Sequence, residues 1–542
     1  MAYNTAVCPC RLVVARTSTE GGIVNGGRGG GVLRRFAILK GHTFTRRQAI
    51  RSGVAASLAA AASSTTRAAS YPTTRPARSE VGNIIFMVAD GMSAGVPSMT
   101  ELLSRRARGR GTHWYDLQQH PETTCGYFET HSLNSPVTDS SAASSAWGSG
   151  SRIFNGALNK LPDGTNLTPI AMLVKDTRRR VGLVTTTTIT HATPAGFAAV
   201  EKARSSEDEI AEQYLDRVDV LMGGGLEFFK ADRRKDEKDL IDAYRDKGYA
   251  YWDHRQQVVD GSNPEKILGL FDSGHLPYAI DRQNQEKLAA KLPTLAEMTR
   301  AALNSLAPSP NGFLLQIEGG RVDHAAHAND AAALLWEQLA FDDAIGVVRE
   351  FLGGHPETLV VITTDHGNAN PGLRGMGSGY SDTEKCFDIL AGVRASFDVL
   401  QQELKRAARD SGGARDAIVE VVRSTCGIEL ARKDADTVVS IVAGTLPYEA
   451  NKQLANAHGL LGQILGNYTG VGFNGTKHTE DPAPVLALGA GRSQFSGLLR
   501  NTGAFVRMTG AFGIQYRNPS MTVARARAYL SQVPDVDPVH WA

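Results

Sequence analysis

Asn83–Ala89, with the sequence NIIFMVA, is a short apolar run that ends directly at Asp90. Two further apolar runs end in the same way: Phe313–Ile317 (FLLQI) before Glu318, and Leu359–Thr364 (LVVITT) before Asp365 and His366. Runs this short and this rich in Ile and Val are typical of buried strands. Ligand sites of open α/β sheets lie at the strand ends. The sequence therefore predicts that the Asp, Glu and His residues at these ends form one multi-metal site.

The rest of the chain alternates between strand-like and helix-like segments. Further strands are predicted at 181–187, 219–223 and 484–489, and helices at 141–147, 205–217, 237–247, 328–351 and 520–531. This alternation predicts an α/β fold with a mostly parallel sheet and helices on both faces. Residues 376–470 break the pattern, because segments 397–409 and 435–443 have helical patterns and no strong strand lies among them. We therefore expect a helical insertion there, before the last site-bearing loop.

The composition fits a folded chain with a sizeable core. Of 542 residues, 42% are hydrophobic, which is ample for one large α/β domain with insertions or for two domains. The formal net charge of +2 is uneven, since residues 1–65 carry +8 and the remaining 477 residues therefore carry −6. The sequence has no basic patch interleaved with aromatic residues, so we expect no stable nucleic-acid partner.

The basic front end has the pattern of an export signal. Thr45–Ile50 (TRRQAI) contains a twin arginine, and Val54–Ala62 (VAASLAAAA) follows as a weakly apolar stretch with small residues after it. The stretch is too short and too weakly apolar to span a membrane. We therefore interpret residues 1–65 as a twin-arginine signal with an N-terminal extension. The mature chain is expected to begin within 62–80, to contain no transmembrane segment and to work in the periplasm or outside the cell.

Three cysteines remain after such a signal is removed: Cys125, Cys386 and Cys426. They show no CxxC spacing, so a thiolate metal site is not indicated. Two hypotheses stay open on composition alone. Cys386 and Cys426 could form a disulfide and leave Cys125 free, or all three could be buried free thiols.

Asp139 and Ser140 open an Ala- and Ser-rich stretch that ends at Trp147. Asp is a favoured residue before a helix, so Ser140 is expected at a helix N-terminus, where free N–H groups and the helix dipole favour an anion. An ordinary N-cap explains the same pattern. The Gly-x-Ser-x-Gly elbow of serine hydrolases does not surround this residue, so a hydrolase triad is not indicated. If metals activate the hydroxyl instead, no His base is needed.

The segment Glu318–His327 (EGGRVDHAAH) carries the sharpest metal pattern. Asp323 and His327 are four residues apart, so on a helix they share one face and can bind one cation. Glu318 offers hard carboxylate oxygen that suits Mg²⁺, and the pair Asp365-His366 offers the mixed ligands that Zn²⁺ accepts. His478 is expected in a polar loop before the strand at 484.

With these motifs in view, the chain resembles the alkaline phosphatase family over about residues 80–515. The segments that carry the resemblance occur in the family's order: Asn83–Met92 (NIIFMVADGM), Val137–Leu158 (VTDSSAASSAWGSGSRIFNGAL), Thr190–Gly196 (THATPAG), Glu318–His327, Thr364–Asn368 (TDHGN) and Lys477–Thr479 (KHT). The combination is highly specific, although TDHG alone is shared with the wider superfamily. The resemblance implies an alkaline-phosphatase-like α/β domain at 80–542, with the insertion of 376–470 inside it.

The resemblance also implies roles for individual residues. Ser140 matches the nucleophile that is phosphorylated during turnover. Arg204, eleven residues after Thr193, matches the arginine that grips two phosphate oxygens. The implied cofactors are two zinc ions and one magnesium ion. The matching ligands are Asp323, His327 and His478 for one zinc, Asp90, Asp365 and His366 for the second, and Asp90, Thr193 and Glu318 for magnesium.

Two positions depart from the pattern of some bacterial members. His191 and His324 stand where those members have Asp and Lys, and other members of the family have His at both places. The departure bears on the identity of the third metal. Both histidines are therefore additional candidate ligands.

The implied function is an exported, metal-dependent phosphomonoesterase that acts on small phosphate monoesters through a phosphoserine. One competing hypothesis is a phosphodiesterase or sulfatase of the same superfamily, which would use Thr or a modified Cys as nucleophile. Another is a non-catalytic phosphate-binding or metal-storing protein, which would predict that the nucleophile or the arginine is missing. The physiological substrate and the oligomeric state, a homodimer included, stay open.

Overall fold

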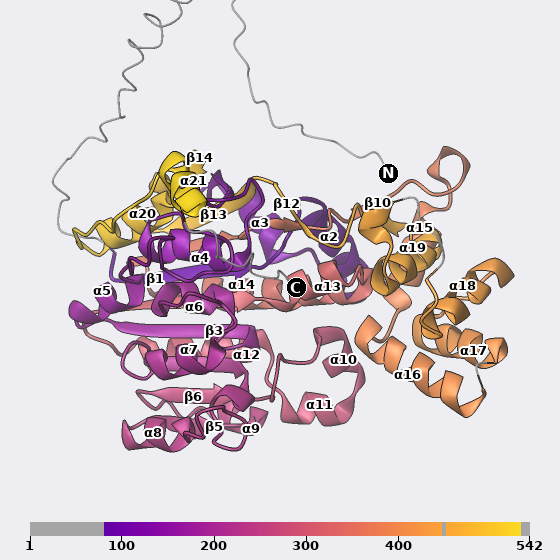
Figure 1. The fold of residues 1–542 in the computed structure, drawn as a ribbon, viewed down its shortest axis with the longest axis horizontal. Helices are drawn as coiled ribbons and strands as arrows, with labels where there is room; N and C mark the ends of the chain where they lie inside the picture. The colour runs from indigo at the N-terminus through magenta and orange to yellow at the C-terminus, as the bar shows by residue number, and fades with distance from the viewer. Residues whose placement is uncertain (1–80, 413, 447–450, 533–542) are drawn as a thin grey trace, which may run out of the picture. The chain divides into compact units, whose positions relative to one another are not determined.

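The computed structural model describes residues 81–412, 414–446 and 451–532. The predicted export signal and the start of the mature chain lie outside these residues. Ten of the described strands form one sheet, in the order β14-β2-β13-β8-β1-β7-β3-β4-β6-β5 (Figure 1). These strands are β1 Asn83–Ala89, β2 Thr124–Glu129, β3 Arg180–Thr188, β4 Val220–Gly224, β5 Ala250–Trp252, β6 Ile267–Leu270, β7 Phe313–Gly319, β8 Thr358–Thr363, β13 Ala483–Gly489 and β14 Gly497–Arg500.

The sheet is mostly parallel, as the sequence predicted. Strand β13 is the exception, because it runs antiparallel to both of its neighbours, β2 and β8. Every predicted strand is present, but β2, β5, β6 and β14 were not predicted. These four lie at the two edges of the sheet and are short or half-exposed, so they lack the long apolar run of a central strand.

The three strands of the opening prediction lie side by side at the centre of the sheet. In the pairing of β1 with its two neighbours, Val88 is level with Glu318 of β7 and with Thr363 of β8. All three strands run in the same direction, so they end at the same edge of the sheet. This register brings Asp90, Glu318 and Asp365 to one place.

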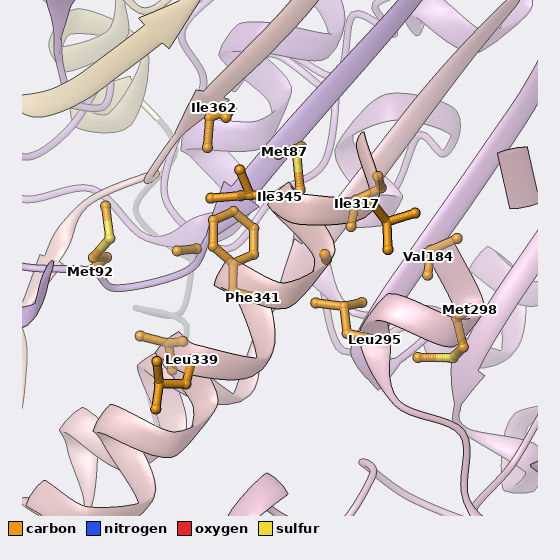
Figure 2. Close-up of a cluster of buried hydrophobic side chains, with 14 of the residues drawn as sticks. Met87, Met92, Val184, Leu295, Met298, Ile317, Leu339, Phe341, Ile345 and Ile362 are labelled. Atoms are coloured by element: carbon orange, nitrogen blue, oxygen red, sulfur yellow. The ribbon is translucent and has the colours of Figure 1, made fainter. Parts of the chain in front are cut away.

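Both faces of the sheet are covered, and the alternation of side chains along β1 shows why. Met87 belongs to one buried hydrophobic cluster and Phe86 to another, because successive strand residues point to opposite faces. Figure 2 shows part of the first cluster, where Met87, Ile317 and Ile362 from the three central strands gather with Phe341 and other side chains of helix α14. The central strands are therefore held in register by apolar contacts on both sides.

Helices fill the connections between the strands. The first half of the sheet is connected by α2 Gly95–Arg108, α3 His113–Gln119, α4 Ser140–Ser149, α5 Ile170–Asp176, α6 Ala192–Ala198, α7 Glu207–Tyr214, α8 Leu240–Asp246 and α9 Arg255–Val259. The second half is connected by α10 Ala279–Asn284, α11 Glu286–Lys291, α12 Leu295–Leu306, α13 Arg321–His327 and α14 Ala331–Gly354, and α20 Gly503–Ala511 and α21 Val523–Gln532 follow the last strand. Each of the five predicted helices is present. The long one starts three residues later than predicted, because Asp330 accepts a hydrogen bond from the Ala333 N–H and caps it.

The segment predicted as an insertion is helical. Strands β10 (Gly372–Leu373) and β11 (Val471–Gly472) pair with each other at its two ends. Between them lie α15 Thr383–Gly392, α16 Phe397–Asp410, α17 Arg415–Cys426, α18 Arg432–Val442 and α19 Ala457–Thr469. These helices gather beside the sheet (Figure 1) and enclose a hydrophobic cluster of their own, which includes Leu400, Ile418 and Val438.

The cysteines of the described chain are unpaired. Cys386 and Cys426 are buried, whereas Cys125 is exposed on β2. The disulfide hypothesis is therefore wrong for this structure, and the free-thiol hypothesis holds except for the burial of Cys125. Within the described residues, none of the helices has the length and apolar character needed to cross a membrane.

Candidate metal centre and nucleophile

Ser140 is the first residue of helix α4, as the sequence predicted. Asp139 precedes it in an extended conformation, and its carboxylate accepts hydrogen bonds from the Ala142 N–H at 2.9 Å and from the Ser141 hydroxyl at 2.7 Å. The cap is therefore supplied by Asp139, which leaves the Ser140 hydroxyl free for other contacts. Ser140 Oγ lies 3.3 Å from His366 Nε2. The helix-start hydroxyl thus borders the predicted metal ligands.

The first group of candidate ligands contains Asp90, Asp365 and His366, whose ligand atoms all lie within 4.8 Å of one another. His366 Nε2 is 3.0 Å from Asp365 Oδ2 and 3.7 Å from Asp90 Oδ1. The other oxygen of Asp365, Oδ1, accepts a hydrogen bond from the Gly91 N–H at 3.0 Å. All three side chains are completely buried. One carboxylate oxygen of Asp365 is therefore held by the backbone, and the other points into the group.

The second group contains Asp323, His327 and His478. His327 Nε2 lies 3.3 Å from Asp323 Oδ2 and 3.0 Å from His478 Nε2. Asp323 and His327 both come from α13, so the predicted i, i+4 arrangement is confirmed. Gly91 makes room for this group, because a Cβ at its position would lie 2.4 Å from Asp323 Oδ1 and its φ is +68°.

His478 enters the site by a route that the sequence did not predict. The residue belongs to a two-residue strand, β12 (His478–Thr479), which pairs antiparallel with β9 (Gly367–Asn368). The predicted polar loop is therefore wrong at this point, because two residues are too few to show a strand period. The pairing stacks the His478 ring on the His366 ring, with a centroid distance of 3.7 Å. His478 therefore reaches the site because its strand, β12, pairs with the strand that directly follows Asp365-His366.

The third group contains Asp90, His191 and Glu318. Thr193 Oγ1 lies 3.4 Å from Asp90 Oδ2, and His191 Nδ1 lies 3.9 Å from Glu318 Oε1. The Thr185 hydroxyl of β3 donates to the other oxygen of Glu318, Oε2. Asp90 belongs to both the first and the third group, so its two oxygens join them.

The hydrogen bonding of these groups fits bound cations. Four buried ligand atoms have no hydrogen-bond partner among the described residues: Asp90 Oδ1, Asp365 Oδ2, Glu318 Oε1 and His191 Nδ1. Buried polar atoms are costly unless they are satisfied, so unpaired atoms gathered in one place indicate an absent partner. The three carboxylate oxygens can each offer a lone pair to a metal ion, and His191 Nδ1 can do so when the imidazole hydrogen is on Nε2.

The imidazoles of the first two groups are oriented in the way that metal ligands require. Each has its Nδ1 against a backbone carbonyl: His327 at 2.7 Å from Thr476 O, His366 at 3.2 Å from Gly367 O, and His478 at 3.0 Å from Thr138 O. A carbonyl oxygen only accepts, so each Nδ1 carries the proton and donates it. Each Nε2 therefore presents a lone pair to its group, which is the usual arrangement around a metal.

The charges of the site also indicate that it binds cations. Burial raises the pKa of Asp90 well above its usual range, and the carboxylates of Asp365, Asp323 and Glu318 raise it further. Several carboxylates in one buried space repel one another unless positive charge is present. A cation shared between the groups would remove this penalty.

Arg204 is a cationic side chain close to Ser140. Its Nη1 donates to Asp139 Oδ2 at 3.2 Å, and its Nη2 lies 3.0 Å from His191 Nε2. Burial acts to lower the pKa of Arg204, but the nearby carboxylates of Asp139 and Asp90 outweigh burial and raise it. The eleven-residue spacing therefore places a charged guanidinium beside the residue that caps Ser140.

Two histidines extend the site beyond Arg204. The ring centroid of His324 lies 5.6 Å from that of His191 and 4.5 Å from that of His275. His275 was not predicted, because it follows the unpredicted strand β6. Burial, together with the neighbouring His191, Arg321 and Arg204, lowers the pKa of His275 to about 3. Recognition of β6 as a strand would have pointed to His275, since the other candidates also follow strand ends.

The structure thus brings all of the predicted site residues into one cluster. Comparisons with known proteins agree on the family that this chain resembles. A family model described as alkaline phosphatase matches residues 81–405. Alkaline phosphatase 4 of Bacillus subtilis (strain 168) is 27% identical over 436 residues, which cover 78% of this chain and 87% of that protein.

Two solved structures extend the similarity to three dimensions. The crystal structure of Thermus thermophilus alkaline phosphatase is 36% identical with a TM-score of 0.77, over 83% of this chain and 95% of that chain. The cold-active alkaline phosphatase from the psychrophile Shewanella sp. is 25% identical with a TM-score of 0.64, over 79% of this chain and 99% of that chain. The similarity therefore covers about four fifths of this chain and nearly all of each solved relative.

Proposed function

The chain belongs to the alkaline phosphatase family, and we propose that it hydrolyses phosphate monoesters outside the cytoplasm through a phosphoserine formed at Ser140. Membership makes it an alkaline phosphatase, a metal-binding phosphomonoesterase. The observation that carries the proposed mechanism is the position of Ser140 Oγ, 3.3 Å from His366 Nε2 and at the start of a helix.

The proposed reaction has two half-reactions. Ser140 Oγ attacks the phosphorus of the monoester, the bond from phosphorus to the ester oxygen breaks, and the proton lost by Ser140 ends on the leaving alcohol. A water molecule then attacks the phosphorus of the phosphoserine, the bond from phosphorus to Ser140 Oγ breaks, one water proton returns to Ser140 Oγ, and inorganic phosphate is released. The helix N-terminus stabilises negative charge at Ser140 in both half-reactions.

Arg204 binds the phosphate group in this proposal. Its guanidinium is already oriented before substrate arrives, because Asp139 holds Nη1 and His191 contacts Nη2. A planar guanidinium can contact two phosphate oxygens at once, and an oriented one loses less side-chain entropy on binding. The contacts that we propose are to the phosphate, so the leaving group should be loosely specified.

The three groups of ligands divide naturally among the proposed cations. One zinc would be held by Asp323, His327 and His478, the second by Asp90, Asp365 and His366, and magnesium by Asp90, Thr193 and Glu318. When bound, these cations supply positive charge that lowers the pKa of the attacking hydroxyl and stabilises the transferring phosphate. The unpaired atoms Asp90 Oδ1, Asp365 Oδ2 and Glu318 Oε1 support this assignment.

Identification of the phosphorylated residue tests the mechanism. The enzyme is mixed briefly with an aryl phosphate, quenched in acid and digested, and the phosphorylated position is located by mass spectrometry. Wild-type protein and a Ser141→Ala variant should carry phosphate on Ser140, whereas Ser140→Ala should carry none. Label on another residue in the wild type would contradict the proposal.

Substrate preference distinguishes the proposed phosphomonoesterase from a phosphodiesterase or sulfatase of the same superfamily. A phosphodiesterase or sulfatase should turn over a diester or a sulfate ester faster than the matching monoester. We expect the opposite order, with aryl phosphate the preferred substrate. All three rates should be measured on one preparation with known zinc and magnesium content.

Export is proposed from the sequence. The twin arginine Arg46-Arg47 and the weakly apolar stretch that follows support it. Expression of the full chain in a bacterium with a twin-arginine pathway should place active enzyme in the periplasm. Replacement of both arginines with lysine should retain it in the cytoplasm, and equal periplasmic activity of the two forms would contradict export by this route.

A further inference from the structure

The first turn of helix α16 is fastened to the body of the protein by buried carboxylates. Asp281 of α10 accepts hydrogen bonds from the N–H of Ser396 at 2.8 Å and from its hydroxyl at 2.6 Å. Asp330 accepts one from the Phe397 N–H with one oxygen, while its other oxygen caps α14. Both carboxylates are almost fully buried. The start of α16, within the helical insertion, is therefore fixed against the junction of α13 and α14, next to the metal ligands.

The next residue of α16 extends this attachment toward the site. Asp398 Oδ2 accepts a hydrogen bond from Arg321 Nη2 at 3.2 Å. Arg321 is the first residue of α13, its guanidinium lies 3.7 Å from the centroid of the Tyr278 ring, and only 11% of its side chain is exposed. Its other terminal nitrogen, Nη1, lies 3.0 Å from His324 Nδ1. A continuous chain of contacts thus runs from the insertion through Arg321 to His324.

The contact between Arg321 and His324 determines where the imidazole carries its proton. A guanidinium only donates hydrogen bonds, so His324 Nδ1 must accept. The ring is then neutral with its hydrogen on Nε2. A protonated ring nitrogen has no lone pair for a metal, but it is a hydrogen-bond donor. The ring lies beside His191, which contacts the phosphate-binding candidate Arg204.

We infer that Asp398 and Arg321 are positioning residues that hold His324 as a hydrogen-bond donor for the phosphate group of the substrate. The helical insertion acts on the reaction through this chain of contacts. His324 is accordingly a phosphate-facing donor and not a ligand of the third metal. The identity of the acceptor rests on the proposed function, whereas the proton position follows from the contacts of the protein alone.

Measurements of metal binding distinguish whether His324 is a hydrogen-bond donor or a metal ligand. His324→Ala should keep the zinc content of the wild type, measured by plasma mass spectrometry, and its affinity for Mg²⁺ alone, measured by titration calorimetry. Loss of zinc, or a tenfold or greater loss of Mg²⁺ affinity, would show that His324 is a ligand and overturn the inference. These measurements need no substrate, so they remain informative if the proposed mechanism fails.

The role of the insertion is tested with a matched pair of variants. Asp398→Asn weakens the contact with Arg321, and Asp436→Asn is the control. Asp436 lies in the same insertion, is exposed to a similar degree (59% against 54%) and accepts a hydrogen bond from Arg415. Among the described residues, no hydrogen bond or ion pair joins its side chain to α13. Asp398→Asn should weaken inhibition by inorganic phosphate and raise KM by roughly three- to tenfold, the worth of one hydrogen bond, with a smaller change in kcat. Asp398→Glu should restore much of the loss.

The proton position can be observed directly. In protein with ¹⁵N-labelled histidine, the His324 signals are identified by their absence from His324→Ala, and their shifts report which ring nitrogen carries hydrogen. Wild type and Asp436→Asn should show hydrogen on Nε2, and Arg321→Gln should show a mixture of the two forms. Hydrogen on Nδ1 in the wild type, or equal phosphate inhibition in Asp398→Asn and Asp436→Asn, would overturn the inference. A failure of the proposed function would instead appear as absent phosphate on Ser140 in the wild type.

Discussion

Arg204 Nη2 lies 3.0 Å from His191 Nε2, so the phosphate-binding candidate touches a candidate ligand of the third metal. Arginine only donates, so His191 Nε2 accepts and the imidazole hydrogen is on Nδ1. That nitrogen faces Glu318 Oε1 at 3.9 Å. His191 can therefore bind a cation through Nδ1 only if its hydrogen moves to Nε2 and the contact with Arg204 opens. The third metal and the phosphate-binding arginine compete for one imidazole.

This competition predicts a weak third site in the wild type. Added Mg²⁺ should raise the activity of the purified enzyme, and the metal of this site should exchange readily. His191→Asp should lower the Mg²⁺ concentration needed for half-activation, because a carboxylate joins Glu318 and Asp90 around a hard cation. The measurement is an Mg²⁺ titration of both proteins at fixed zinc. Identical midpoints would show that His191 does not tune the site and would favour a packing role.

Ser140→Ala should fold normally, because alanine is well tolerated near a helix start and Asp139 supplies the cap. Phosphate release should fall by several orders of magnitude, since the covalent route is lost. Activity is measured with an aryl phosphate after the zinc content has been matched to the wild type. Near-normal turnover of the metal-loaded variant would remove Ser140 from the mechanism.

Arg204→Ala should weaken the binding of inorganic phosphate and of substrate by about 1–3 kcal/mol, the worth of a charged hydrogen-bonding partner. Its zinc content should not change, because Arg204 is not a candidate ligand. A suitable control is Arg179→Ala, since that guanidinium lies 4.3 Å from the Phe512 ring centroid, away from the site. Phosphate inhibition that equals that of the control would show that the eleven-residue spacing is misleading.

Glu337 makes stability depend on pH. Its side chain on α14 is buried and Oε1 accepts a hydrogen bond from the Ala279 N–H at 2.6 Å, yet burial raises its pKa to about 7. The folded state therefore keeps a proton that the unfolded chain loses above its own lower pKa, so this group lowers stability as pH rises through that window. Glu337→Gln keeps the acceptor without the charge.

Glu337→Gln should thus raise the melting temperature more at pH 8.5 than at pH 5. The gain in the free energy of unfolding should be larger at pH 8.5 by at most an amount on the order of 2–3 kcal/mol. Thermal unfolding of zinc-loaded protein at both pH values measures it. Glu350→Gln on the same helix is the control, because 66% of that side chain is exposed. Equal pH dependence of the two variants would mean that Glu337 ionises normally in the folded protein.

The local pattern of the sequence was sufficient for the centre of the fold. The apolar runs before Asp90, Glu318 and Asp365 are long enough to identify central strands, and parallel neighbours must end at the same edge. The spacing of Asp323 and His327 was equally informative, because helical geometry relates residues four apart without help from the rest of the chain. Site residues that follow short or edge strands were harder to predict from the sequence, as His275 after β6 shows.

The sequence by itself therefore determined the central acids and histidines, because a predicted strand or helix marks each of Asp90, Glu318, Asp323, His327, Asp365 and His366. The roles of Ser140, Thr193, Arg204 and His478 came from the resemblance to the family. The tertiary structure decided how they are shared: that Asp90 serves two groups, that His478 reaches His366 through the pairing of β12 with β9, and that Asp139 and His191 hold Arg204. It also decided that Asp398 reaches His324 through Arg321. Strand and helix patterns are local and can be read along the chain. Contacts between distant segments depend on sheet register and helix packing, which become defined only when the whole core is assembled.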